Sequence, residues 1–203
     1  MSIEIFIKRL SQSLQRQLPG ENAHRKFLPK ERSLIKNVEE TTKGAVLIVI
    51  NFKDNEPYIT FIQRSQYDGH HSGQIAFPGG KFDPSLDLDL MDTALRETYE
   101  EIGLRIEKNQ ILGGLTPLFI PVSKIMVFPF VAIASSVREI APDYREVADV
   151  FSIPISAFNE GKIKLGTFGR DSNMVEAPYW DVDDHKIWGA TAMILNEFLE
   201  ILS

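Results

Sequence analysis

Residues 45–50 form a short and wholly apolar segment, Ala45-Val46-Leu47-Ile48-Val49-Ile50. The segment is short for a helix and rich in β-branched residues, which favours a strand. Because consecutive residues of a strand point to opposite faces, an uninterrupted apolar run predicts a strand that is covered on both sides of its sheet. The segment therefore predicts a layered α/β domain.

Further strands and helices are predicted on the C-terminal side of this segment. Turn-forming residues 51–56 lead to a strand at 58–63, which predicts a hairpin. A third strand is predicted at 74–77, and the glycines that follow Pro78 end it. The pattern then becomes helical from Asp87 to Ile102, with Gly103 as the C-terminal cap. Strands are predicted at 111–115, 124–134 and 147–153, and a closing helix at 189–202.

The N-terminal region has a helical pattern of its own. Apolar residues recur every three or four positions, which predicts an amphipathic helix ended by Pro19-Gly20; they are Ile3, Ile7, Leu10, Leu14 and Leu18. Residues 20–43 are polar with few periodic signals, so we expect them to connect this helix to the main domain. The apolar stripe suits either a homodimer contact or packing against the same chain, and the pattern does not separate the two.

The composition is that of a folded protein. Of 203 residues, 43% are hydrophobic and 25% charged, with a net charge of −6. An acidic chain is poorly suited to nucleic acid, and no apolar run approaches the roughly 18 residues of a membrane span, so we expect neither partner. The absence of cysteine excludes disulfides, thiolate metal sites and thiol nucleophiles. Because neither end resembles a secretory or peroxisomal signal, we expect a cytoplasmic protein.

The predicted helix at 87–102 carries an acidic face. At about 100° per residue, Glu97, Glu100 and Glu101 fall within about 100° of one another, apart from the apolar sector. Two carboxylates about 6 Å apart repel by roughly 0.7 kcal/mol in water and about 3 kcal/mol at an effective dielectric of 20. On a solvated surface the cluster would mean little. In a cleft it needs protons or a cation, and oxygen ligands favour Mg²⁺ or Mn²⁺.

The residues before this helix favour a cation-binding cleft. The segment reads Phe77-Pro78-Gly79-Gly80-Lys81. Two glycines after a strand allow another group to approach the backbone closely and leave carbonyl oxygens that can bind a metal ion. A strand, a glycine turn, a loop and an acidic helix together predict a site for a metal-bound diphosphate.

These residues resemble those of the Nudix hydrolase family. The stretch from Gly80 to Leu104 ends in the family's Arg-Glu-x-x-Glu-Glu-x-Gly core, Arg96-Glu97-Thr98-Tyr99-Glu100-Glu101-Ile102-Gly103. The loop between Gly80 and Arg96 is about two residues longer than in the family, and Leu86 stands where the family has its first acidic residue. Asp87 and Asp89 are both candidates for that role.

The surrounding sequence resembles the coenzyme A pyrophosphatase branch of the family. The upstream signature of that branch is matched by Gln63-Arg64-Ser65 and by the run from Gly73 to Gly80. Gly69 stands in place of the second arginine of the signature, and Thr60-Phe61-Ile62 in place of its Leu-Leu-Thr lead-in. Downstream, Glu146-Val147 and the segment 187–192 also resemble this branch, so the resemblance covers roughly residues 43–200.

The resemblance implies an α/β/α sandwich around a mixed β-sheet, with a Nudix hydrolase domain over residues 43–203 and an N-terminal helix and connecting segment over 1–42. It implies metal-dependent pyrophosphatase activity on a nucleoside diphosphate derivative, with Mg²⁺ or Mn²⁺ as cofactor. Coenzyme A or an acyl derivative, giving 3′,5′-ADP and 4′-phosphopantetheine, is the expected substrate. The alternatives are another nucleotide (a nucleotide sugar, a dinucleotide or an oxidised triphosphate) and a catalytically silent nucleotide-binding regulator.

The resemblance also implies roles for individual residues. By position, Glu97, Glu100 and Glu101 would be metal ligands, with one of them acting as base, and Gly79 or Gly80 would offer a carbonyl. Arg96 would pair with a carboxylate of the motif and orient it.

The remaining candidates have two interpretations each. Expected substrate contacts are Arg64, Gly79, Gly80 and Lys81, although Arg64 equally suits a solvent-exposed strand end. Glu146 is either a further acid of the site or a surface residue. His70 and His71 are either substrate contacts or ordinary loop residues. Trp188 would stack on a base or lie in the core, and His24 and His185 are expected to be structural or exposed.

Overall fold

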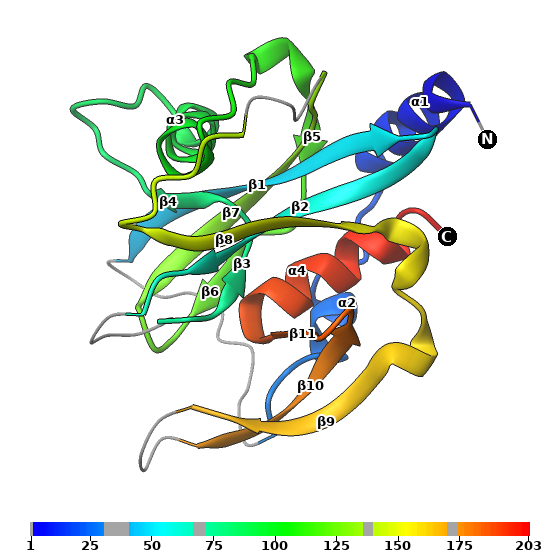
Figure 1. The fold of residues 1–203 in the computed structure, drawn as a ribbon, viewed down its shortest axis with the longest axis vertical. Coiled ribbons are helices and arrows are strands. Elements are labelled where there is room, and N and C mark those ends of the chain that lie inside the picture. The colour runs from blue at the N-terminus through cyan, green and yellow to red at the C-terminus, as the bar shows by residue number, and fades with distance from the viewer. Residues whose placement is uncertain (1, 31–40, 67–71, 136–139, 170–173) are drawn as a thin grey trace.

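The computed structural model describes residues 2–30, 41–66, 72–135, 140–169 and 174–203. A mixed sheet forms its centre, and the described strands of this sheet run in the order β3-β2-β1-β7-β5, with β4 paired to β1, β6 to β7 and β8 to β2 (Figure 1). These strands are β1 (Thr42–Lys53), β2 (Glu56–Arg64), β3 (Ile75–Ala76), β4 (Gly79–Lys81), β5 (Ile111–Gly114), β6 (Leu118–Ile120), β7 (Ile125–Ile133) and β8 (Val147–Pro154).

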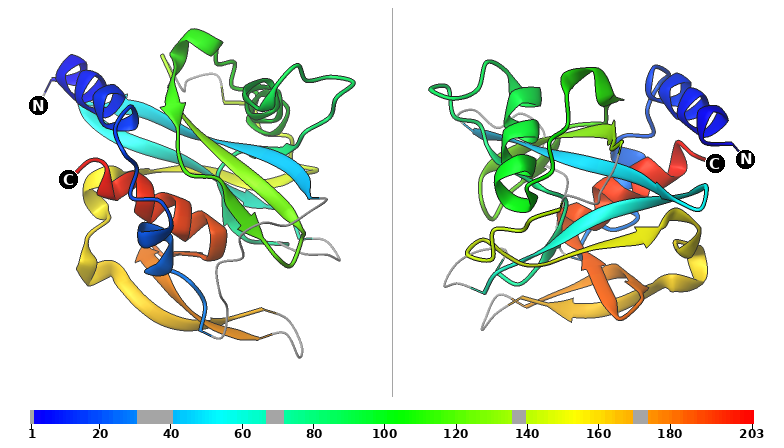
Figure 2. Two further views of the ribbon diagram at one scale, coloured as in Figure 1. Left: turned by 180° about the vertical axis from the view of Figure 1, so that it is seen from behind. Right: turned by 45° about the horizontal axis from the view of Figure 1, so that its top comes forward.

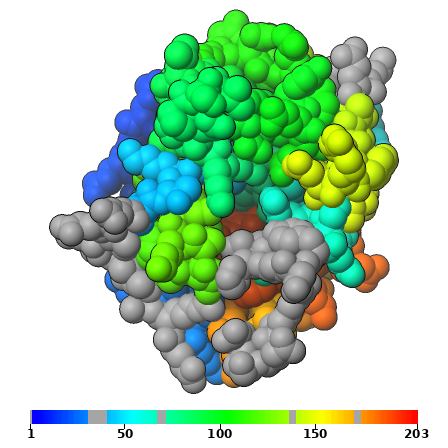
Figure 3. Space-filling view, turned by 90° about the vertical axis from the view of Figure 1, so that its left-hand side faces the viewer, coloured from blue at the N-terminus to red at the C-terminus, as the bar shows by residue number. Residues whose placement is uncertain are grey.

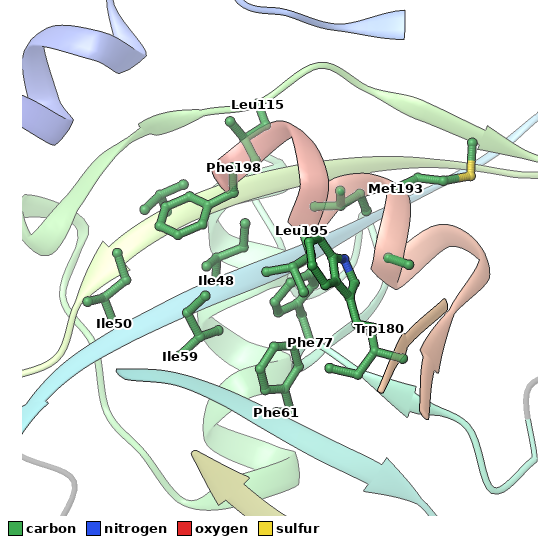
Figure 4. Packing of buried hydrophobic residues seen from close by; sticks show 14 of the residues in the cluster. Ile48, Ile50, Ile59, Phe61, Phe77, Leu115, Trp180, Met193, Leu195 and Phe198 are labelled. Carbon is green, nitrogen blue, oxygen red and sulfur yellow. The ribbon is translucent and has the colours of Figure 1, made fainter. Parts of the chain in front are cut away.

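Strand β1 is buried on both faces, which confirms the prediction for residues 45–50. It pairs parallel with β7 and antiparallel with β2 and β4. Ala45, Leu47 and Val49 pack in one apolar cluster with helix α3 (Leu90–Ile102). Ile48 and Ile50 belong to a second cluster with helix α4 (Gly189–Glu200), and Figure 4 shows them facing Leu195 and Phe198.

Helices α3 and α4 cover opposite faces of the sheet. All the ribbon views place α3 on one side and α4 on the other (Figure 2). Because each helix buries its apolar stripe against one face of β1, neither apolar face of the sheet is left in water. The predicted α/β/α sandwich around a mixed sheet is therefore confirmed.

The N-terminal helix packs against its own chain. Helix α1 ends at Leu14, one turn before the predicted end, and Phe6, Leu10 and Leu14 join the cluster that contains α4. The segment predicted to be a plain connection contains a short helix, α2 (Glu21–Arg25), and residues 31–40 of it lie outside the described residues. Five residues are too few to give a periodic signal, which explains the missed helix.

A buried carboxylate joins this N-terminal segment to α4. Glu197 is inaccessible to solvent and accepts hydrogen bonds from the backbone N–H of Gly20 (3.1 Å) and the Thr116 hydroxyl (2.6 Å). The Nε2 atom of His24 lies 3.0 Å from Glu197 Oε2, so the expected structural role of this histidine is confirmed. The network links three segments far apart in the sequence.

A second, smaller sheet was not predicted. It consists of β9 (Ile163–Phe168), β10 (Val175–Val182) and β11 (His185–Trp188), all antiparallel. Gly166, Pro178 and several charged residues interrupt the apolar alternation of these strands, so the pattern gave no strand signal. The Trp188 ring stacks on Phe168 with 4.6 Å between centroids. Short 3₁₀ turns occur at Lys108–Gln110, Ile155–Ala157 and Glu160–Lys162.

None of the helices in the described part of the chain combines the length and the apolar character that crossing a membrane requires.

Truncation of Leu10 tests whether the N-terminal helix is part of the same cooperative core. Leu10 is fully buried, so Leu10→Ala should lower the free energy of unfolding by about 2–5 kcal/mol while the transition stays single. Urea denaturation measures both. Ile5→Ala, on the exposed side of α1, is the matched control and should change stability by less than about 1 kcal/mol. A separate early transition of α1 would contradict the prediction.

Candidate active site

The acidic helix begins three residues later than predicted. The Asp89 side chain caps it by accepting a hydrogen bond from the Asp92 N–H at 2.9 Å, so Asp87 and Asp89 both precede the helix. The predicted C-cap is confirmed, since Gly103 has φ of 70°. A Cβ at that position would lie 2.9 Å from the carbonyl oxygen of Ala141, so the adjoining segment also requires glycine here.

Glu101 points from α3 into the protein, toward the glycine turn. Its carboxylate accepts a hydrogen bond from the Gly79 N–H at 2.9 Å and lies 3.4 Å from Nη1 of Arg64. Burial raises the pKa of Glu101 to about 7, and the charges of Glu97 and Glu146 add to this effect. The contacts with Gly79 and Arg64 oppose it. The carboxyl group therefore titrates near neutral pH.

Glu97 lies directly against Gly80. A Cβ on Gly80 would come within 2.3 Å of the Glu97 carboxyl carbon, so any other residue would displace this side chain. Burial is also the main cause that raises the pKa of Glu97, while Arg96 opposes it. Because Gly80 has no side chain, the Glu97 carboxylate of the acidic helix can lie directly against the backbone of the turn.

The two glycines face different neighbours. A Cβ on Gly44 would lie 2.7 Å from the Gly80 oxygen, so this oxygen faces β1. The Gly79 N–H instead points to the acidic helix, where Glu101 accepts its hydrogen bond. Gly79 also has φ of 148°, and a Cβ there would lie 2.2 Å from the Ala45 oxygen.

Arg96 connects four acidic or carbonyl groups around the turn. Its Nε and Nη2 atoms donate to the two oxygens of Asp87 at 2.8 and 2.9 Å. Its Nη1 atom donates to Glu97 at 3.0 Å and to Glu100 at 2.8 Å, and Nη2 also reaches the Lys81 carbonyl. These hydrogen bonds raise the pKa of Arg96, and they are the main cause that lowers the pKa of Asp87 to about 2.

The structure gives different surroundings to the three acids whose role the sequence left open, Asp87, Asp89 and Glu146. Asp87 is buried, and Arg96 and the Thr93 hydroxyl (2.8 Å) occupy its oxygens. Asp89 caps the helix and pairs with Lys108 at 3.2 Å. Glu146 is exposed in the turn before β8, where its backbone carbonyl accepts a hydrogen bond from the Ser65 N–H (2.9 Å). Its charge nevertheless raises the pKa values of Glu97 and Glu101.

Within the described residues, no group of three or more acidic or histidine side chains is arranged to hold a metal ion as it stands. Arg96 occupies one oxygen of Glu97 and one of Glu100, and Glu101 is turned toward the Gly79 N–H. The donor set nevertheless fits a hard divalent cation, because it consists of carboxylate and carbonyl oxygens and the missing Cβ at Gly80 brings them together.

The other candidates lie at different places. Arg64 is at the site, and its Nε atom is buried without a hydrogen-bond partner in the described part of the chain. Lys81 is exposed at the end of β4. His185 stacks on Phe151 with 3.8 Å between centroids. His70, His71 and Gly69 lie outside the described residues.

The face of the molecule that includes this turn is hollowed. In Figure 3 the light-blue start of β1, the yellow-green β6–β7 region and the green segment that carries α3 form part of the rim of a hollow, and red atoms of α4 are visible inside it. The sequence did not predict that α4 would contribute to this surface. The sequence also did not predict the hydrogen bond between Gly79 and Glu101, or that Asp87 is the acid outside the helix that pairs with Arg96.

Comparisons with known proteins identify the family of the chain. The NUDIX domain model matches residues 41–171. The human protein named mitochondrial coenzyme A diphosphatase NUDT8 is 32% identical over 167 residues, which cover 79% of this chain and 69% of that protein. The uncharacterized Nudix hydrolase NudL of Yersinia enterocolitica is 40% identical over 164 residues, covering 77% of this chain and 80% of that protein.

A solved structure shows the same fold. The MutT/nudix family protein from Enterococcus faecalis aligns with a TM-score of 0.54 at 18% identity, over 81% of this chain and 63% of that chain. The matched domain model covers more than half of the residues, and the acidic helix and glycine turn described above lie inside the match. The chain therefore belongs to the Nudix hydrolase family and is a pyrophosphohydrolase that acts on nucleoside diphosphate derivatives.

Proposed function

We propose that the protein hydrolyses the diphosphate of coenzyme A or an acyl-CoA, producing 3′,5′-ADP and 4′-phosphopantetheine. One P–O–P linkage breaks, and the oxygen of water joins one of the two phosphorus atoms. The observation that carries the proposal is the packing of Glu97 and Glu101 against the Gly79–Gly80 turn. The likeness to the human and mouse coenzyme A diphosphatases, which spans 79% of the chain, supports the choice of substrate.

Each residue at the turn has a proposed role. Glu97, Glu100 and Glu101, together with the Gly79 carbonyl, would hold Mg²⁺ or Mn²⁺, and Glu146 would add a further negative charge. When bound, such an ion lowers the pKa of coordinated water and neutralises charge on the diphosphate. Arg96 orients Glu97 and Glu100 through the hydrogen bonds described above and is itself held by Asp87.

Two residues have a proposed role toward the reacting groups. Glu101 would accept a proton from the attacking water, in addition to its contact with the ion. Arg64 carries a buried N–H without a partner in the described residues and would donate it to a phosphate oxygen. The expected cytoplasmic location is a separate prediction, because the human relative is named as mitochondrial.

The substrate proposal is tested by product analysis. The protein is incubated with Mg²⁺ or Mn²⁺ and separate samples of coenzyme A, acetyl-CoA, a nucleotide sugar, a dinucleoside polyphosphate and an oxidised nucleoside triphosphate. Mass spectrometry should show 3′,5′-ADP and a 4′-phosphopantetheine compound from the first two at the highest rates. Cleavage of nucleotide sugars with coenzyme A intact would contradict the proposal and leave the family assignment unchanged.

Replacement of Glu101 tests its part in the reaction. Glu101→Gln keeps an acceptor for the Gly79 N–H but removes the ionisable group, so turnover should fall at least about a hundredfold while the melting temperature stays nearly unchanged. Steady-state kinetics at saturating Mg²⁺ measure the effect. Glu4→Gln, an exposed acid on α1, is the matched control and should leave turnover unaffected. Near-native turnover of Glu101→Gln would refute the role.

The raised pKa of Glu101 also predicts a pH-dependent stability in the presence of a metal chelator. Because the pKa is higher in the folded state (about 7) than its ordinary value of 4.5, the folded state favours the protonated form. This stabilisation is complete below pH 4.5 and is lost as the pH rises through 7, by roughly 3 kcal/mol in total.

Urea denaturation at pH 5 and pH 8 measures this loss. The wild-type protein should lose about 2.5 kcal/mol more than Glu101→Gln over this interval. Equal losses in the two proteins would show that Glu101 has an ordinary pKa.

A further inference from the structure

Strand β3 lies where two central strands of the main sheet separate. In the described part of the chain, β1 and β2 pair with each other only over residues 49–53 and 56–60. Beyond this stretch, β1 pairs with β4 and β2 pairs with β3. The segment from β3 to β4 therefore crosses from one strand to the other, and the glycine turn is its second half.

The carbonyl group of Ile75 in β3 points away from β2. Successive residue pairs of an antiparallel ladder alternate between hydrogen-bonded and non-hydrogen-bonded pairs. The Arg64 N–H donates to the Gln74 carbonyl at 3.0 Å. The next pair, Gln63 with Ile75, is therefore of the non-hydrogen-bonded kind. The Ile75 carbonyl is thus left out of the ladder, and the Thr191 hydroxyl of α4 donates to it at 3.0 Å.

The first turn of α4 is itself held by the small sheet. Strand β11 leads directly into α4, and Trp188 at its end pairs with Tyr179 of β10. The Trp188 ring also stacks on Phe168 of β9. Gly189 follows with φ of 63°, which glycine adopts without strain, so the chain passes from the sheet into the helix at a fixed point. Thr191 therefore joins the small sheet to β3 through a short connection.

Strand β3 also lies between the two groups that contact Glu101. Arg64, whose backbone bonds to β3 at residue 74, has its Nη1 atom 3.4 Å from the Glu101 carboxylate. Gly79, four residues after Ile75, donates its N–H to the same carboxylate at 2.9 Å. A shift of β3 would move both donors relative to Glu101. A misplacement of about 1 Å in a reacting site can lower a rate by about a hundredfold.

We propose that Thr191 is a positioning residue for the hydrolysis, because its hydrogen bond to β3 keeps the Arg64 and Gly79 donors aligned with Glu101. Thr191 acts through the backbone of β3 and lies outside the range 41–171 that the domain model matches. The inference rests on the proposed role of Glu101 and is independent of the choice of coenzyme A as substrate.

Removal of the hydroxyl tests this role in the reaction. Thr191→Val keeps the shape of the side chain but leaves the Ile75 carbonyl without this donor. With Mg²⁺ and the compound that product analysis shows to be cleaved fastest, kcat should fall about tenfold while KM changes less than about twofold. Thr191→Ser retains a hydroxyl and should keep kcat within about twofold of the wild type. Ile153→Val, a buried change on β8, is the control that lowers stability by a similar amount and should leave kcat unchanged.

Amide exchange gives a second readout that does not depend on turnover. The Gly79 N–H is protected by its hydrogen bond to Glu101, so its exchange with deuterium, measured by NMR with a metal chelator present, reports this contact. In Thr191→Val the Gly79 amide should exchange at least about fivefold faster, while the amide of the fully buried Leu10 keeps its wild-type rate. Thr191→Ser should exchange like the wild type at both positions.

An unchanged kcat in Thr191→Val, or a loss that Thr191→Ser shares, would overturn the inference. An equal loss of kcat in Ile153→Val would also overturn it, because the effect would then follow from stability alone. If no compound is cleaved, the proposed function fails, and the exchange of Gly79 decides on the positioning role. Faster exchange in Thr191→Val alone then supports that role, and equal exchange in the wild type and both Thr191 variants overturns it.

Discussion

The close contact between the glycine turn and the acidic helix is the constraint on which the site depends. Glu101 accepts a hydrogen bond from the Gly79 N–H, and Glu97 occupies the space that a side chain at Gly80 would fill. The same turn belongs to β4, which pairs with β1 at the centre of the sheet. Because β1 is fixed by apolar packing on both faces, the position of the turn is set by the core. As a consequence, the carboxylate of Glu101 is buried and that of Glu97 is partly buried. Burial then raises their pKa values, so the fold itself tunes these acids.

Arg96 makes this crowding of acids possible. A guanidinium group presents donors in a fixed planar arrangement, and here they contact Asp87, Glu97 and Glu100 at once. Asp87 is buried with both oxygens occupied, so it fixes the arginine, whereas Glu97 and Glu100 retain oxygens that can accept other ligands. A cation that binds these two acids would compete with Nη1 of Arg96 while the pair with Asp87 stays intact. The pair with Asp87 would then keep the arginine in place whether or not an ion is bound.

The sequence predicted the parts of the fold that have a strong local signal. The apolar run at 45–50 gave a doubly buried strand, the three- and four-residue spacing gave α3 and α4, and Gly103 gave the helix end. The start of α3 was misplaced because Asp87 and Asp89 are both good residues for a helix start, and only tertiary contacts to Arg96 and Asp92 distinguish them. The small sheet and α2 were not predicted, because short or interrupted elements show no regular spacing of apolar residues. The opposite faces of Gly80 and Lys81 depend on strand register, which residue types alone do not determine.

The domain model matches residues 41–171. Elements on either side of this range nevertheless contribute to the structure that forms the site. Helix α4 lies on the opposite face of β1 from α3, and the Thr191 hydroxyl donates to the Ile75 carbonyl at 3.0 Å. Ile75 belongs to β3, which leads directly into Pro78 and the glycine turn. Glu197 in turn holds α4 to the N-terminal segment through Gly20 and His24. Displacing this buried carboxylate would cost free energy, because its buried donors would be left without a hydrogen-bond partner. The N-terminal segment therefore supports the glycine turn through α4 and β3, although it lies far from the acidic helix in the sequence.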